Sequence, residues 1–224
     1  MAKKKEEQII DVRDTYTRVE SWINSNQKLL SGVAIGLLVL VAAFAYVKRV
    51  YLPEKEKEAA NDIYIAQQYF QMDSFKLALQ GDGESFGLED VIEDYKFTKT
   101  ANLAKYYAGM SYLQLGDYDE AIDYLSKFKS KDMFVKPMAI GAIGDAHAEQ
   151  GDMGKALSFY EKAASHNKNT LTTPLFLKKA AMLNEVEGNY DKALKLYSRL
   201  KNEYPESTEA EQIDKYIARV EVLN

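Results

Sequence analysis

The distribution of apolar residues divides the chain into two parts, one with a single long apolar run and one with helical periodicity. Residues 29–47 contain no charged residue, and the run is bounded by Lys28 on one side and by Lys48 and Arg49 on the other. A helix of this length is about 28 Å long, close to the thickness of the hydrocarbon core of a bilayer. The pattern therefore predicts a single transmembrane helix over residues 29–47.

Two other interpretations of the apolar run are a buried helix of a soluble protein and a cleaved signal peptide. A buried helix usually keeps a polar stripe, whereas this run has only Ser31. Ala43-Phe44-Ala45 offers a small-x-small cleavage site. Against cleavage, the preceding segment is long and carries five acidic residues, whereas signal peptides begin with a short basic region. The membrane span is therefore the better supported interpretation.

Residues 1–28 form a tail before the span, and part of this tail is amphipathic. Val12, Tyr16, Val19 and Ile23 recur at helical spacing, with Trp22 beside them. Such a helix would lie in the membrane interface or pack on a neighbouring membrane protein. A loosely ordered tail is an equally acceptable alternative at this stage.

Basic residues on the two sides of the span predict its orientation. Six precede it, at positions 3, 4, 5, 13, 18 and 28, and four follow it closely, at positions 48, 49, 55 and 57. The positive-inside rule then favours a cytoplasmic N-terminus. In a Gram-negative cell the larger C-terminal part would be periplasmic.

Beyond the span, a repeated pattern indicates pairs of helices. The three copies begin at Ala108 (AGMSYLQLGDYDEAIDYLSKF), Ile143 (IGDAHAEQGDMGKALSFYEKA) and Ala180 (AAMLNEVEGNYDKALKLYSRL). In each copy a glycine ends one helix, an alanine follows five residues later, and a large residue follows four after that. The triplets are Gly116–Ala121–Leu125, Gly151–Ala156–Tyr160 and Gly188–Ala193–Tyr197.

Each feature that these copies share has a physical role in a helical pair. Small residues at Gly109, Gly144 and Ala181 would let the first helix cross closely against the second. The alanines of the triplets, Ala121, Ala156 and Ala193, are their small partners on the second helix. Glycines such as Gly116, Gly151 and Gly188 would take the left-handed conformation at the helix end. Successive glycines are 35 and then 37 residues apart. The pattern resembles the tetratricopeptide repeat, whose period is about 34 residues.

The resemblance implies an all-α chain in which the transmembrane helix is followed by an α-solenoid. We expect repeats over residues 101–206 and a helical linker with a degenerate first helical pair over residues 48–100. In that pair the helices would cover residues 54–79 and 86–95. A capping helix is expected over residues 207–224, opened by a capping box of Thr208 and Glu211.

Composition excludes several classes of function. The formal charge of −5 argues against a nucleic-acid surface, and the absence of cysteine excludes disulfides, thiolate nucleophiles and zinc fingers. The histidines, His147 and His166, are too far apart in sequence to suggest a metal site, and His147 occupies a repeat position suited to packing. We therefore expect no catalytic residue, cofactor, metal or small-molecule substrate.

The remaining candidate site is the groove lined by the first helix of each pair. The register of the resembled family places a mixed set of methionine, leucine and charged side chains there, which suits a partner helix or varied peptides. The expected protein-binding residues are Tyr106, Met110, Leu113, Met138, Asp145, Glu149, Leu175, Lys178, Met182 and Glu185.

The whole layout resembles the YfgM-like family of bacterial inner-membrane proteins. The shared features are a short tail, the segment VESWINSNQK running into the span, a helical linker and degenerate repeats. The resemblance implies an ancillary subunit of the Sec translocon that assists secreted proteins. Its implied partners are translocon subunits and a membrane-anchored periplasmic chaperone similar to prolyl isomerases. Two alternatives remain open: a targeting receptor whose repeats face the cytosol, and a scaffold for envelope assembly.

Overall fold

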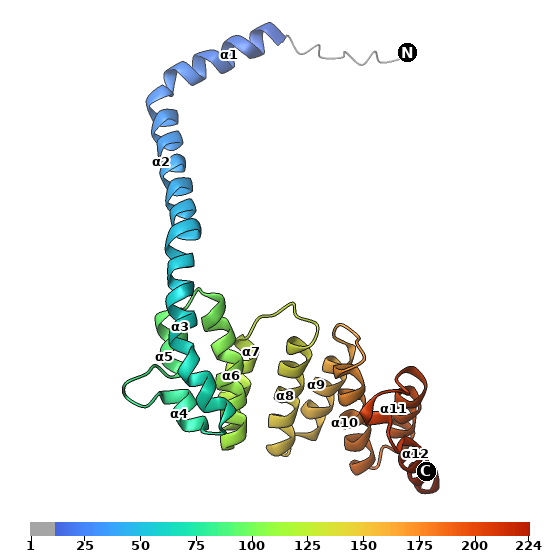
Figure 1. Cartoon of the computed structure of the whole chain (residues 1–224). Coiled ribbons are helices and arrows are strands. Elements are labelled where there is room, and N and C mark those ends of the chain that lie inside the picture. Colours follow the sequence, from blue (N-terminus) through green and yellow to red (C-terminus); the bar gives the residue numbers. More distant parts are fainter. Residues whose placement is uncertain (1–11) are drawn as a thin grey trace, which may run out of the picture. The chain divides into compact units, whose positions relative to one another are not determined.

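The computed structural model describes residues 12–224, and its side chains are described from Thr15 onward. Every regular element among these residues is a helix (Figure 1). The chain separates into two compact units, which meet in sequence between Glu54 and Lys55. Each unit is described by itself.

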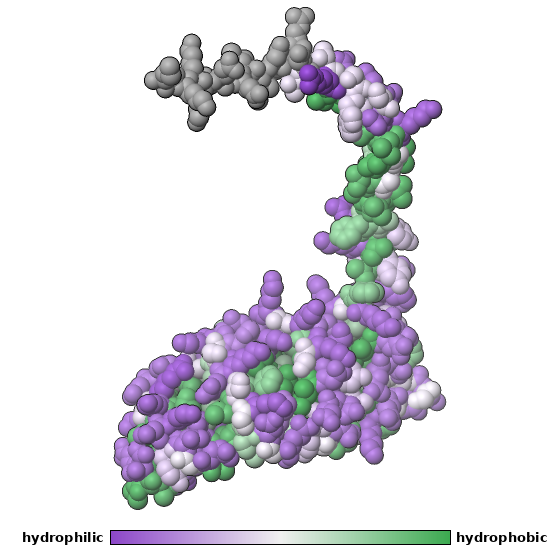
Figure 2. Space-filling model, turned by 180° about the vertical axis from the view of Figure 1, so that it is seen from behind, coloured by the Kyte–Doolittle hydropathy of each residue, from purple (hydrophilic) through white to green (hydrophobic). Residues whose placement is uncertain are grey.

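The N-terminal unit contains α1 (Val12–Ser25), α2 (Gln27–Tyr46) and a π-helical turn, η1 (Val47–Tyr51). None of the residues of α2 is buried, and Figure 2 shows hydrophobic side chains over the surface of this helix. The helical path runs without interruption from Gln27 to Gln71, and its apolar stretch is long enough to cross a membrane. This long apolar N-terminal helix agrees with the sequence prediction.

The described part of the amphipathic segment before the span is helical, over Val12–Ser25. α1 ends at Ser25, and Asn26 then donates a side-chain hydrogen bond of 2.8 Å to the carbonyl oxygen of Trp22. Tyr16, Val19, Trp22 and Ile23 are all exposed. The early part of the tail, residues 1–11, lies outside the described residues.

The C-terminal unit is an array of antiparallel helices. It begins within α3 (Leu52–Gln71) and continues through α4 (Phe75–Gln80) and α5 (Leu88–Asp94). Three helical pairs then follow one another along the array (Figure 1). Their bounds are α6 (Lys99–Leu115) with α7 (Tyr118–Lys127), α8 (Val135–Glu149) with α9 (Met153–Ser165), and α10 (Thr172–Val186) with α11 (Tyr190–Glu203).

Small residues let the two helices of a pair approach closely. A side chain added at Gly109 would place its Cβ 2.5 Å from Leu125 Cγ, and one at Gly144 would lie 2.8 Å from Tyr160 Cδ1. Ala181, which takes this place in the third pair, is completely buried. The alanines that face these positions, Ala121, Ala156 and Ala193, are also completely buried.

The turn between the two helices of each pair contains a glycine in the left-handed conformation. Gly116, Gly151 and Gly188 have φ of 85°, 79° and 73°, as the sequence predicts. In the second pair, His147 is buried and its ring stacks on Phe159 at 5.4 Å, as expected for a packing residue.

The region before the repeats differs from the predicted pair of helices. Residues 54–79 do not form one helix, because α3 ends at Gln71 and α4 begins at Phe75. Asp73 lies in the break with a φ of 56°, which cannot continue a right-handed helix. α5 covers Leu88–Asp94, close to the second predicted helix.

The predicted capping box after Pro205 is wrong. Ser207, and not Thr208, acts as the cap: its hydroxyl accepts a 3.2 Å hydrogen bond from the backbone N–H of Ala210 in a short 3-10 turn, η2 (Thr208–Ala210). Gln212 then has a φ of 61°, so the final helix α12 begins only at Ile213 and runs to Leu223. The terminal helix is present, but its start is later than predicted.

Candidate protein-binding groove

The groove is the surface formed by the first helices α6, α8 and α10, extended by α12. It contains two pockets, which we name by the helix at their centre. The α8 pocket has a volume of about 440 Å³ and combines charged and aromatic side chains. It is lined by Leu113, Gln114, Tyr118, Asp145, Ala148, Glu149, Tyr160 and Lys179.

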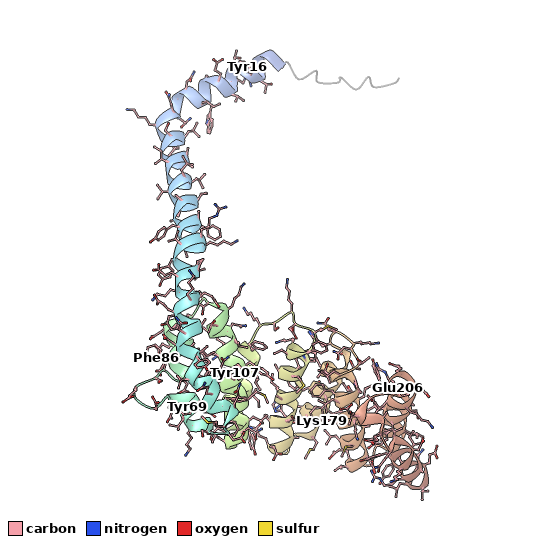
Figure 3. All side chains as sticks on the ribbon, in the orientation of Figure 1. Tyr16, Tyr69, Phe86, Tyr107, Lys179 and Glu206 are labelled. Carbon is pink, nitrogen blue, oxygen red and sulfur yellow. The ribbon has the colours of Figure 1, made fainter. Side chains whose placement is uncertain are left out.

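A hydrogen-bonded triad organises the polar side of the α8 pocket. The Asp145 carboxylate accepts a 2.7 Å hydrogen bond from the Tyr160 hydroxyl on α9. The ammonium group of Lys179, labelled in Figure 3, reaches from α10 and donates to both oxygens of Asp145, at 2.6 and 2.8 Å. Burial, followed by the bond to Asp145, raises the pKa of Tyr160. The hydroxyl therefore remains a donor at physiological pH, and the acid is held in a fixed position.

The α12 pocket repeats this arrangement one helix further along. Arg219 forms a two-point ion pair with Glu185, with nitrogen–oxygen distances of 2.6 and 2.9 Å. The Tyr197 hydroxyl donates to the same carboxylate at 2.9 Å. The pocket has a volume of about 370 Å³ and is lined by Met182, Glu185, Val186, Tyr190, Arg219 and Leu223.

The acid and the base of each triad have the same sequence spacing. Asp145 and Lys179 are 34 residues apart, as are Glu185 and Arg219. Each acid lies on one first-layer helix and each base lies on the next, so the pairs connect α8 to α10 and α10 to α12. Two-point Arg–carboxylate pairs fix orientation as well as charge. The triads therefore hold neighbouring repeats in register and leave a row of fixed charges along the groove.

A pH prediction follows from Glu185. Burial pushes the pKa of this carboxyl upward, but the hydrogen bonds from Arg219 and Tyr197 outweigh burial and leave its pKa below the ordinary value. A lowered folded-state pKa contributes stability above the unfolded pKa of about 4.3, and this stability is lost as pH falls through the folded value. The urea midpoint of the native chain should therefore fall more steeply between pH 5 and 3 than that of Glu185→Gln.

Far-ultraviolet circular dichroism during urea unfolding of the detergent-solubilised chain would measure this difference. Glu161→Gln removes an exposed carboxylate from a second helix and is the matched control. Equal pH slopes for the native chain and Glu185→Gln would contradict the prediction.

Half of the predicted groove residues line a pocket. Leu113, Asp145 and Glu149 meet in the α8 pocket, and Met182 and Glu185 meet in the α12 pocket. The structure thus brings together residues from different helices in each pocket.

The other five predicted residues are engaged in packing between neighbouring helices. Tyr106 and Met110 pack against a core cluster that includes Phe128 and Ile143, and Met138 and Leu175 pack against one that includes Phe176. The Lys178 ammonium lies 5.3 Å from the centre of the Tyr216 ring.

Sequence reasoning missed Lys179 and Arg219, the basic members of the triads. A search for acid–base pairs at the repeat spacing would have found both, because each base follows its acid by 34 residues. Gln114, Tyr118 and Tyr190 in the pocket walls were also missed. They carry no comparable pattern.

Within the described residues no group of three or more histidine or acidic side chains could hold a metal ion. Asp145 and Glu185 are instead engaged by the tyrosine and basic side chains of the triads. The geometry is that of a recognition surface with fixed charges and adaptable apolar side chains.

Comparison with known families agrees with the helical-pair geometry. Two family models, both described as tetratricopeptide repeat, match the chain, one over residues 103–132 and 175–207 and the other over residues 139–172. These ranges coincide with the three helical pairs. Residues 103–207 form a tetratricopeptide-repeat (TPR) array.

The TPR array is also similar to solved structures. A crystal structure of the nearly identical TPR-like repeats of a candidate kinesin light chain from Podosopora anserina has a TM-score of 0.57 at 15% identity, covering 75% of this chain and 88% of that one. A variant of the same protein with one substitution gives the same TM-score and identity and is covered over 87% of its length. At this identity the likeness concerns the fold alone. No curated protein matches the chain.

Proposed function

We propose that this protein is a membrane-anchored scaffold that binds other proteins through the groove of its TPR array and does not act as an enzyme. The observation that carries the proposal is the groove itself, in which fixed charges alternate with exposed apolar side chains. The anchor is the apolar helix α2, none of whose residues is buried. Apolar residues without a protein environment are best accommodated by lipid.

The partner proposed here is a peptide segment that carries both basic and apolar side chains. In the α8 pocket the exposed carboxylate of Glu149 lies beside the ion pair of Asp145 and Lys179. Leu113 and the Tyr160 ring supply apolar walls. A partner helix or extended segment could place a lysine or arginine near Glu149 and apolar side chains against these walls.

At a finer level we propose an ancillary role at the Sec translocon of a bacterial inner membrane. The support is the resemblance of the layout to YfgM-like proteins, together with the excess of basic residues before the span. In this proposal the N-terminus is cytoplasmic and the TPR array is periplasmic. Its partners are translocon subunits and a membrane-anchored periplasmic chaperone similar to prolyl isomerases.

Site-specific photocrosslinking in intact cells would test the groove. With benzoylphenylalanine at Glu149, we expect crosslinked products that mass spectrometry identifies as translocon subunits, the chaperone or secreted proteins. Benzoylphenylalanine placed instead at Glu161, which is exposed on the second helix of the same pair, should give at least several-fold fewer crosslinked products. Equal yields at the two positions would argue against recognition through the groove.

The identity of the products separates the alternatives. Cytosolic precursors would indicate a targeting receptor with the opposite topology, and cell-wall or division proteins would indicate an envelope scaffold. Either result would overturn the translocon role and leave the anchored scaffold in place. A C-terminal alkaline phosphatase fusion, active only outside the cytoplasm, would report topology independently.

A further inference from the structure

The connections between successive helical pairs form one edge of the array, which we call the loop edge. It consists of residues 95–98 between α5 and α6, residues 128–134 between α7 and α8, and residues 166–171 between α9 and α10. All three precede a first helix, so alternation of helix direction places them on the same side, as Figure 1 shows.

Hydrogen bonds join the middle connection to the start of α6 and to the third connection. The Asn102 side chain at the start of α6 donates to the carbonyl of Lys129 at 2.7 Å and accepts from the Lys129 backbone N–H at 3.0 Å. The Asn169 side chain donates to the carbonyl of Met133 at 3.0 Å. The connection over residues 128–134 is therefore bonded on both sides, to α6 and to the connection over residues 166–171.

The start of the C-terminal unit lies at this same edge. The Glu56 carboxylate accepts hydrogen bonds from the backbone N–H groups of Lys99 and Thr100, at 2.6 and 3.1 Å. The Lys55 ammonium lies 5.5 Å from the centre of the Tyr95 ring. Because Lys55 follows the last residue of the apolar run by eight residues, the chain between them reaches at most about 28 Å even when fully extended. The loop edge is thus tethered close to the end of the proposed span.

Large apolar side chains are exposed along the loop edge. Phe97 is 85% exposed, Leu171 62%, Met133 45% and Phe134 40%. Each of the three connections contributes at least one of them. Aromatic and aliphatic tips on successive loops are unfavourable in water and are favoured at the headgroup level of a bilayer.

The charges of the loop edge have the sign that suits an anionic surface. The connections carry Lys96, Lys129, Lys131 and Lys168, and their one aspartate, Asp132, accepts hydrogen bonds from the backbone N–H groups of Phe134 and Val135. The turns within the pairs, on the opposite edge, carry instead Asp117, Asp152 and Glu187 and no basic residue. The array is therefore polarised across its width.

The basic and apolar character stops at the last connection. Residues 204–212, between α11 and α12, carry Glu206, Glu209 and Glu211 and no basic residue. Among the connections that precede α6, α8, α10 and α12, the feature is thus confined to the first three.

We propose that the loop edge rests on the bilayer surface, with Phe97, Phe134 and Leu171 at headgroup level and the lysines against anionic lipid phosphates. This inference rests on the proposed membrane anchor. Docking in this way would hold the array beside the membrane and leave the acidic opposite edge toward the aqueous phase.

The absence of cysteine from the chain permits a direct test with the full-length protein. Single cysteines at Phe97, Leu171, Glu187 and Leu38 would be labelled with an environment-sensitive fluorophore. Each variant would be reconstituted into vesicles of phosphatidylcholine with about 30% phosphatidylglycerol, an anionic lipid, with and without a lipid that carries a nitroxide near its headgroup. Because Leu38 lies at the middle of the proposed span, its label would be read with a lipid whose nitroxide lies at the end of an acyl chain. We expect at least three-fold greater quenching for the labels at Phe97 and Leu171 than for the label at Glu187.

The label at Leu38 separates the two proposals. If the label at Leu38 is quenched while the labels at Phe97 and Leu171 are quenched no more than the label at Glu187, the membrane anchor is correct and the docking of the loop edge is wrong. That result would be expected if a protein partner covered the loop edge. If the label at Leu38 is not quenched either, the anchor fails and the docking proposal fails with it.

The lysines require a second comparison. Replacing the four connection lysines by glutamine should reduce quenching at Leu171 at least two-fold, whereas replacing Lys76, Lys192, Lys195 and Lys215, which are exposed elsewhere, should leave it unchanged. Equal quenching in vesicles with and without phosphatidylglycerol would overturn the role given to anionic lipid.

Discussion

Replacing Gly141 by valine is expected to destabilise the TPR array by about 2–3 kcal/mol, the upper part of the range of about 1–3 kcal/mol for inserting atoms into a filled core. A Cβ at this position would lie 1.9 Å from Cε1 and 2.1 Å from Cζ of Phe176. The Phe176 ring is 1% exposed and packs between α8 and α10, so it has no free space to enter. Valine would therefore force the two helices apart.

The urea midpoint of the detergent-solubilised chain, followed by circular dichroism, would measure the loss. Gly154→Val is the matched control, because Gly154 also lies in a helix but its added Cβ would meet only Asp152 Oδ1, at 3.9 Å. A change within about 0.5 kcal/mol is expected there. Similar losses at both glycines would show that the contact with Phe176 is not tight.

Arginine at both Leu37 and Leu38 is expected to release the chain from membranes. These residues lie in the middle of α2, and an arginine at the centre of a transmembrane helix costs about 3 kcal/mol on insertion scales. Two such residues exceed what the remaining apolar residues can offset. The fraction that stays with carbonate-washed membranes should fall from nearly all of the protein to a small part.

The control is the double variant Ser126→Arg with Asn202→Arg, which adds the same two charges to the TPR array instead of to α2. Both positions are exposed on second helices, so membrane association should not change. Full retention of the Leu37/Leu38 variant would mean that α2 is not the anchor.

The fold was largely predictable because its determinants are local. Gly116 and Gly188 carry the signal in their own sequence neighbourhood, since a helix end with positive φ favours glycine. Gly109 and Gly144 were identifiable because they recur at the repeat spacing. The break around Asp73 could not be predicted, because the surrounding segment keeps a helical composition and only the φ of Asp73 interrupts the helix.

The groove was predicted less completely because it depends on contacts between repeats. Whether Tyr106 faces a partner or the next helical pair depends on how closely successive pairs approach, and that distance has no local sequence signal. Gly141 illustrates the difficulty: its role follows from Phe176 in the next repeat. Lys179 and Arg219 also act on acids of the preceding repeat.

The triads have a mechanical consequence for the array. They clamp α8 to α10 and α10 to α12, whereas among the described residues no ion pair joins α6 to α8. Opening the seam between α7 and α8 under tension would therefore break apolar packing and the hydrogen bond from Gln150 to Asp119 but no ion pair, whereas separating α8 from α10 or α10 from α12 would also break a triad. The α8 pocket spans that seam, with Leu113 and Tyr118 on one side and Asp145 on the other. A pulling force transmitted through a bound partner would thus act on the width of this pocket without having to break a triad.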